Sequence, residues 1–106
     1  MSNDIVSELT YRAQTLMRTD RPGRYAAQAA KHFGHNCPTE WTGETGFVEF
    51  QAGRCEMATT AEGLLLTARA GTEAGLAQVQ EVIRRHLERW GEKDELRVTW
   101  PQPDAA

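Results

Sequence analysis

The sequence is poor in cysteine and has no long apolar run, and each absence excludes a class of protein. Only two of its 106 residues are cysteine, too few for the disulfide framework of a small secreted domain. The longest apolar run surrounds Leu64 to Leu66, far short of the ~20 residues that span a bilayer. Asp4, Glu8 and Arg12 interrupt the start of the chain, which therefore does not resemble a signal peptide. These features predict a cytoplasmic protein with reduced thiols and no membrane contact.

The net charge is small and negative, at −3 with an isoelectric point near 5.6. The whole molecule therefore has no general attraction for nucleic acid, which is not expected as a partner. The composition, 40% hydrophobic and 25% charged, fits a folded globular protein. A chain of this length forms one domain over residues 1–106, with a core at about 8–100 and a flexible tail at 101–106.

Strand-like and helix-like periodicities follow one another along the chain. Residues 8–13 alternate as a strand, as do four short segments between Thr39 and Ala70 that turn residues separate. Residues 21–33 and 73–90 repeat apolar side chains at helical spacing, with Asp20 and Thr72 as the expected N-caps. A last alternating segment covers residues 96–100, before Pro101.

An antiparallel sheet with one apolar face needs that face covered, and two amphipathic helices are available to cover it. We therefore predict an α+β two-layer sandwich, in which a mainly antiparallel sheet of about six strands carries two helices on one face. The element order is β-α-β-β-β-β-α-β. The expected inward residues of the central strands are Trp41, Val48, Phe50, Cys55, Met57, Leu64, Leu66 and Ala68. Phe47 and Leu65 fall on the outer face, where they mark either a dimer contact or a shift of one residue in the predicted register.

The stretch KHFGHNC gathers two imidazoles and a thiol that could bind a transition metal. His32, His35 and Cys37 would supply three ligands, and His86 of the second helix a fourth. The competing interpretation is that these residues only cap the helix end and are partly buried. We favour the competing interpretation, because structural zinc sites usually show two paired clusters. No cofactor is expected, and a transition metal is the alternative.

Basic side chains gather near the start of the first helix, where they oppose the helix dipole. A phosphate or carboxylate ligand would relieve this arrangement, whereas the simpler interpretation is that the side chains extend into water. The candidate anion-binding residues are Arg18, Arg21, Arg24, Tyr25 and Lys31.

Three stretches, RYAAQAAKHFGH, HLERWGEKDEL and the closing VTW, resemble a bacterial family, the domain-of-unknown-function 2218 family. The resemblance covers about residues 9–100. It implies a small, free-standing bacterial protein, and some members are joined to siderophore-interacting flavin reductases, so it also implies a context of iron handling without an activity. This chain departs from the pattern by an arginine-rich lead-in and by Asn36 and Cys37. The matching positions are Arg24, Tyr25, Lys31, His32, Phe33, His35, His86, Leu87, Glu88, Arg89 and Trp90.

We predict a small binding or accessory module, whose partner is a small anionic ligand or another protein. One alternative is a small metal-dependent or histidine-based enzyme, since His32, His35 and His86 carry imidazoles that titrate near neutrality. Another is a structural dimer through the outer face of the sheet, so the chain is expected as a monomer or a homodimer. A deep pocket lined by two of the histidines would favour the enzyme, and a flat or filled surface the binding module.

Overall fold

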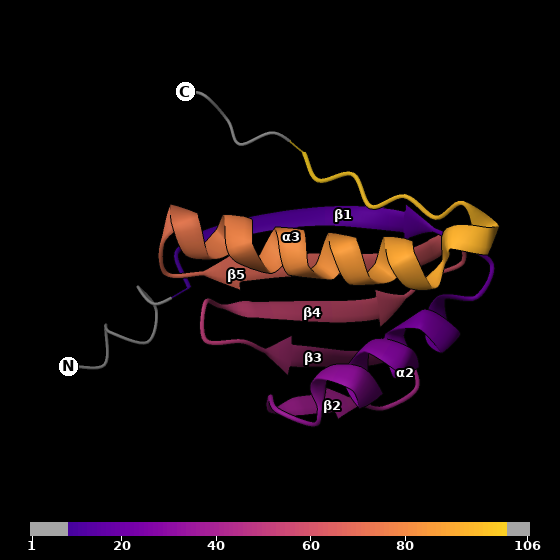
Figure 1. Cartoon of the computed structure of the whole chain (residues 1–106), viewed down its shortest axis with the longest axis horizontal. Helices are drawn as coiled ribbons and strands as arrows, with labels where there is room; N and C mark the ends of the chain where they lie inside the picture. The colour runs from indigo at the N-terminus through magenta and orange to yellow at the C-terminus, as the bar shows by residue number, and fades with distance from the viewer. Residues whose placement is uncertain (1–8, 102–106) are drawn as a thin grey trace.

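The structure is a computed structural model and describes residues 9–101. Two α-helices and five strands follow one another in the predicted order, and a short 3-10 turn follows the second helix (Figure 1). The elements are β1 (Tyr11–Arg18), α2 (Pro22–Phe33), β2 (Thr39–Trp41), β3 (Thr45–Glu49), β4 (Arg54–Thr59), β5 (Gly63–Ala70), α3 (Glu73–Trp90) and the 3-10 turn (Glu92–Asp94).

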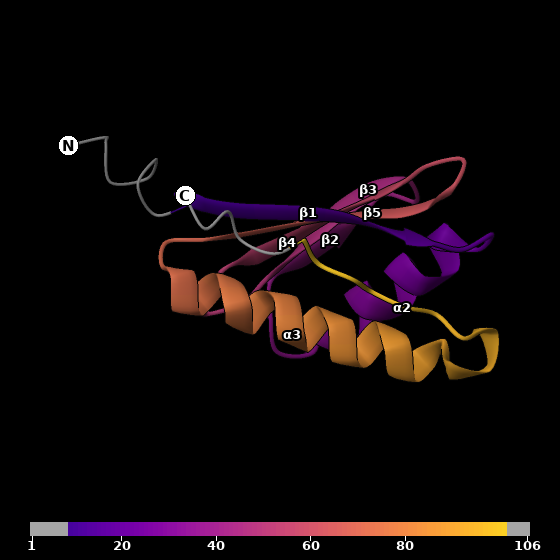
Figure 2. The same cartoon turned by 90° about the horizontal axis from the view of Figure 1, so that it is seen from above.

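The strands form one antiparallel sheet in the order β1-β5-β4-β3-β2. Both helices lie on the same side of this sheet (Figure 2). In Figure 1, α3 runs along β5 and β1, whereas α2 crosses the strands at the β2 end of the sheet. The predicted α+β two-layer sandwich is therefore confirmed.

The core lies between the sheet and the helices, on the face that the alternation of apolar residues predicted. Val48, Cys55 and Met57 are at most 2% exposed, and Trp41 and Phe50 pack against the core from the edge of the sheet. Apolar residues from both helices complete the core, because they recur at helical spacing and so share one side of each helix. The helical members are Tyr25, Ala26, Ala29, Phe33, Val79, Ile83 and Leu87.

The two helices begin differently. The side chain of Thr72 accepts a hydrogen bond from Gly75 N at 2.9 Å, as expected for the N-cap of α3. The prediction of Asp20 as the N-cap of α2 is wrong, because the helix begins at Pro22 and Arg21 is the preceding residue. Arg21 makes no capping hydrogen bond through its side chain. The start of α2 therefore has no side-chain cap, although Asp20 Oδ1 lies 3.9 Å from Nε of Arg21.

The first strand is longer than predicted and begins later in the chain. It pairs with the whole of β5, from Tyr11 opposite Ala70 to Arg18 opposite Gly63. The inward parity is correct, since Met17 is fully buried, but Tyr11 is 38% exposed at the end of the pairing. Pairing with the long strand β5 thus determines the length of β1. The alternation of apolar residues alone does not show this length.

The predicted sixth strand, residues 96–100, is an extended segment outside the sheet. Its inward residues Leu96 and Val98 are buried as expected. However, Val98 N donates to the Glu88 carboxylate of α3 at 3.0 Å, and the side chain of Trp100 donates to Gln80 O at 3.0 Å. Helix α3 thus accepts both hydrogen bonds, and one of them comes from a backbone N–H that a sixth strand would have used to pair with the sheet.

Within residues 9–101, neither helix is both long enough and apolar enough to cross a membrane. Most of the predicted tail, residues 102–106, lies outside the described residues, as do residues 1–8.

Candidate functional site

Two of the predicted metal ligands meet where the end of α2 lies against α3. The ring centroids of His32 and His86 are 5.0 Å apart, and those of His32 and Trp90 are 5.3 Å apart. Phe33 packs against His86 at 4.9 Å and against Phe50 at 5.0 Å. These contacts join α2, α3 and the end of β3 in one aromatic cluster: His32, Phe33, Phe50, His86 and Trp90.

The proton on His86 can be placed from its hydrogen bond. Nδ1 lies 2.8 Å from the carbonyl oxygen of Val82, and a carbonyl oxygen only accepts. Nδ1 therefore donates, which leaves Nε2 as an acceptor in the neutral ring and as a donor in the imidazolium ion. This bond ties the imidazole to its own helix.

The other two predicted metal ligands do not join this pair. His35 is exposed and makes no ring contact with the described residues. Cys37 is half-buried against the core, because the chain turns after α2 and Cys37 N donates to Phe33 O at 2.8 Å. Between residues 9 and 101, no three or more His, Cys, Asp or Glu residues are placed to hold a metal ion. The four predicted ligands are thus not assembled into one site.

The predicted anion site at the start of α2 lies next to a carboxylate from the 3-10 turn after α3, 69 residues later in the chain. Tyr25 is 5% exposed, and its hydroxyl donates to Oδ2 of Asp94 at 2.8 Å. Arg21 and Arg24 are exposed nearby, whereas Lys31 lies seven residues after Arg24, about 10 Å further along the helix. Arg18 of β1 is exposed as well. A single anion site formed by these five residues stays a prediction.

The pKa of the Tyr25 hydroxyl depends on the charges around the start of α2. Burial raises the pKa of its hydroxyl, and the hydrogen bond and negative charge of Asp94 raise this pKa further. The positive charges of Arg24 and Arg21 act in the opposite direction on the pKa, so both lie within electrostatic range of the ring. Asp94 thus brings a negative charge to the region where the sequence suggested an external anion.

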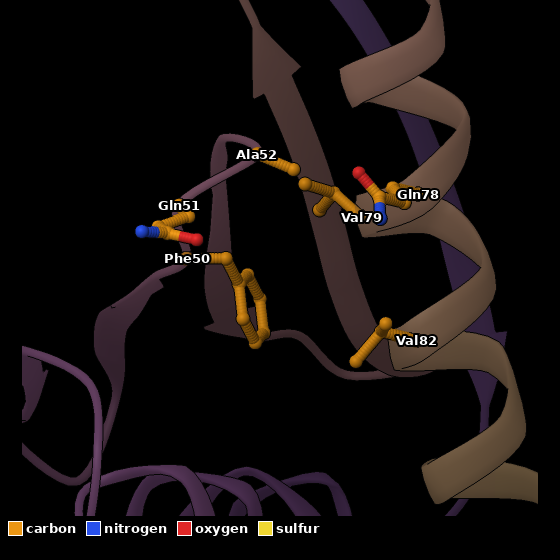
Figure 3. Close-up of a pocket in the computed structure, with 6 residues that line it drawn as sticks. All are labelled: Phe50, Gln51, Ala52, Gln78, Val79 and Val82. Carbon is orange, nitrogen blue, oxygen red and sulfur yellow. The ribbon is translucent and has the colours of Figure 1, made fainter.

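An open hollow lies between α3 and the turn that joins β3 to β4. It encloses about 340 Å³ and is lined by Phe50, Gln51, Ala52, Gln78, Val79 and Val82 (Figure 3). Val79 and Val82 point from the helix toward the turn, which carries Ala52 and Phe50, and Gln51 points away from the helix (Figure 3). We call this hollow the α3 groove. A neighbouring depression of about 680 Å³ shares Phe50, Ala52 and Gln78 with it and extends to Leu9 and Thr72.

A basic hollow lies further along the same helix. It encloses about 400 Å³ and is lined by Arg85, His86 and Arg89. Since residues three and four apart share one side of a helix, these three residues continue the stripe that begins with Gln78 and Val82. One side of α3 is therefore apolar at its start and basic at its end.

Sequence reasoning missed this stripe for two reasons. Phe50 was assigned to the core, which it does contact, but it also forms part of the groove wall. Val82 was assigned to the core as well, because its spacing fits the apolar stripe of α3, yet it is only half-buried. The signal present in the sequence was the spacing of Val82, Arg85, His86 and Arg89, at i, i+3, i+4 and i+7.

Neither described helix lies over the outer face of the sheet (Figure 2). Phe47 and Leu65 lie there as predicted, and they line a depression of about 410 Å³. The guanidinium of Arg54 lies over the Phe47 ring, 4.3 Å from its centroid, and Arg54 also pairs with Glu49 at 3.1 Å. Side chains of the sheet itself therefore cover part of this aromatic surface.

The described elements form a small α+β domain, in which a five-stranded antiparallel sheet carries two helices on one face. The model of a family of uncharacterised proteins conserved in bacteria, DUF2218, matches residues 14–101, and the chain belongs to this family. The resemblance in the helix-end motifs is thereby confirmed.

A solved structure shares the fold of this chain. The NMR structure of PA4090 from Pseudomonas aeruginosa is 31% identical, with a TM-score of 0.74, and the match covers 91% of this chain and 99% of that one. A search of curated proteins finds no match.

Proposed function

We propose that this domain is a binding module that holds a small, largely apolar molecule in the α3 groove. The observation that carries the proposal is the groove itself, a hollow of about 340 Å³ with apolar walls and one amide on the helix side, that of Gln78. Small-molecule sites are typically apolar hollows of roughly 300–1,000 Å³ with a few polar groups that orient the ligand. The size and lining of the groove fall within this description.

The rigidity of the wall supports the same function. Phe50 packs edge to face on Phe33, at 5.0 Å and an interplanar angle of 83°, and Phe33 packs in turn on His86. A wall held by such contacts loses little conformational freedom when a ligand binds, so more of the contact free energy remains as affinity. The groove is thus suited to bind without rearrangement.

A histidine-based enzyme is supported less well. Of His32, His35 and His86, only His86 lines a described hollow, and its Nδ1 is bonded to its own helix. His32 packs against the rings of His86 and Trp90. The iron and siderophore context implied by the family resemblance stays a prediction, because no metal-holding group within residues 9–101 supports it.

The proposal can be tested by titration with the neutral fluorophore N-phenyl-1-naphthylamine, whose emission rises in apolar surroundings. We expect saturable binding to the wild type and an affinity about tenfold lower in Val82→Gln, because the substitution replaces an apolar wall by an amide. Ala77→Gln is the matched control, since Ala77 is exposed on the same helix outside the groove. It should bind as the wild type does.

Absence of saturable binding to the wild type would contradict the proposal, as would equal affinities of the two variants. Circular dichroism of each variant shows whether it folds. If Val82→Gln does not fold, Ala52→Leu narrows the groove from the opposite wall and should weaken binding by a similar factor.

A further inference from the structure

The basic half of the α3 stripe lacks the counter-charges that the rest of the helix has. Arg84 takes both nearby glutamates, with 2.6 Å to Glu81 and 2.9 Å to Glu88. Neither Arg85 nor Arg89 forms an ion pair within the described part of the chain. Two guanidiniums therefore line one hollow without an ion pair to a carboxylate of the described residues.

The acidic groups of the same helix are engaged elsewhere. The hydrogen bond from Arg84 lowers the pKa of Glu81, and the positive charge of Arg85 lowers this pKa only as a smaller contribution. Glu88 accepts from Val98 N through its second oxygen, at 3.0 Å. Neither carboxylate forms an ion pair with Arg85 or Arg89.

The basic hollow and the α3 groove have no lining residue in common, but direct contacts link their walls. Val82 lines the groove, and its carbonyl oxygen accepts from His86, which lines the basic hollow. Phe33 touches both Phe50 of the groove and His86 of the hollow. Val82 and Arg89 are seven residues apart, which corresponds to about 10 Å along the helix. A single small molecule can span this distance.

We infer that the ligand of the groove is an amphipathic organic anion, an aromatic or alkyl carboxylate, whose acid group is bound by Arg85 and Arg89. The inference rests on the proposed function and adds the chemical class of the ligand. The apolar body lies against Phe50 and Val82. The guanidiniums donate charge-assisted hydrogen bonds to the acid group, and the imidazolium form of His86 can add one from Nε2.

The test compares two probes that differ in one anionic group. 1-Anilinonaphthalene-8-sulfonate carries a sulfonate in place of the ligand's carboxylate, and N-phenyl-1-naphthylamine is the same ring system without it. In the double variant Arg85→Gln/Arg89→Gln we expect the affinity for the sulfonate to fall at least tenfold, and that for the neutral probe to change less than twofold.

The matched control is Arg21→Gln/Arg24→Gln, which removes the same charge from the start of α2. It should leave both affinities within a factor of two. Raising the salt concentration from 0.05 to 0.5 M should weaken binding of the sulfonate in the wild type and have little effect in Arg85→Gln/Arg89→Gln.

The possible failures are distinguishable. If the neutral probe binds and the affinity for the sulfonate is unchanged in Arg85→Gln/Arg89→Gln, the groove stands and the anion site is overturned. The anion site is also overturned if the control variant loses as much affinity, because the effect is then one of net charge. If neither probe binds the wild type, the proposed function fails and this inference fails with it. All these substitutions are on exposed side chains, and urea unfolding verifies that each variant is folded.

Discussion

The two basic regions of the molecule differ in what surrounds their charges. At the start of α2, the arginines lie near Asp94, which accepts a hydrogen bond from the buried Tyr25 at 2.8 Å. At the end of α3, Arg85 and Arg89 line a hollow, and no ion pair to either is formed within residues 9–101. The start of α2, which has the higher density of positive charge in the sequence, is thus the region to which the fold brings the carboxylate of Asp94.

This difference shows that charge density in a sequence does not locate a binding site. Asp94 is 69 residues from Tyr25 along the chain, and only the return of the chain after α3 brings it to α2. A group that already has an opposite charge nearby gains less from an added ligand than one without. The four predictions below test the comparison, from the largest expected effect to the smallest.

Phe33→Ala should have the largest effect on stability, because Phe33 touches both Phe50 of the α3 groove and His86 of the basic hollow. The side chain is only 9% exposed, so its removal leaves a cavity, and the free energy of unfolding should fall by about 3–5 kcal/mol. Urea unfolding measures the change. Phe47→Ala on the outer face is the control and should lower the free energy of unfolding clearly less. Equal losses in the two variants would show that Phe33 does not support the α3 groove and the basic hollow.

Cys55 is a titratable group in the core, fully buried in β4. Burial raises the pKa of its thiol to about 12, and the nearby charge of Glu56 adds to this rise. Because the thiol ionises more easily in the unfolded chain, the unfolded state binds fewer protons above pH 9. Stability is therefore retained below about pH 9 and is lost as the pH rises toward 12.

At pH 10 this contribution should cost on the order of 1 kcal/mol relative to pH 8. Urea unfolding at the two pH values measures it. Cys55→Ala should lose less stability over this interval than the wild type, whereas Cys37→Ala should keep the full loss. A wild-type loss that persists in Cys55→Ala would assign the alkaline sensitivity to another group, such as Tyr25.

Tyr25→Phe removes the hydrogen bond that joins α2 to the turn after α3. The free energy of unfolding should fall by about 1 kcal/mol, since the ring still fills its place and only one hydrogen bond is lost. Thermal or urea unfolding provides the measurement. Asp94→Asn keeps a hydrogen-bond acceptor at the same position, so its free energy of unfolding should fall less. No loss in Tyr25→Phe would mean that this contact does not hold the two segments together.

Arg84→Gln should have the smallest effect on ligand binding. Arg84 is half-buried on another side of the helix from the exposed Arg85, and it forms ion pairs with Glu81 and Glu88. The affinity for 1-anilinonaphthalene-8-sulfonate should stay within a factor of two, whereas Arg85→Gln alone should lower it about threefold. Equal losses from the two single variants would remove the distinction between the two sides of α3.

Much of the fold could be predicted from the sequence, because local periodicity and sheet packing agree. The alternation around Val48, Cys55 and Met57 indicated which face is buried, and the spacing of Val79, Ile83 and Leu87 indicated the buried side of α3. The segment after α3 could not be assigned in this way. Its alternation fits a strand, but its hydrogen bonds to the Glu88 side chain and to Gln80 O are long-range contacts that no local pattern contains.

The site was predicted only in part. Spacing on two helices gave no way to tell that His32 would meet His86 at 5.0 Å while His35 and Cys37 would not join them. The cause is the turn after Gly34, which places Cys37 against the core and leaves His35 exposed. The α3 groove depends on a contact between the β3–β4 turn and a helix more than twenty residues later, so it belongs to the tertiary structure alone.

The central claim is that ligands bind along one side of α3, and ¹H–¹⁵N correlation spectra during a titration with 1-anilinonaphthalene-8-sulfonate test it most directly. We predict that the amide signals of residues 50–52, 78–82 and 85–89 shift together with one dissociation constant. The signals of residues 21–25 should stay in place. Shifts confined to residues 21–25, or to residues 45–47, 56–58 and 65–67 on the outer face of the sheet, would contradict the claim.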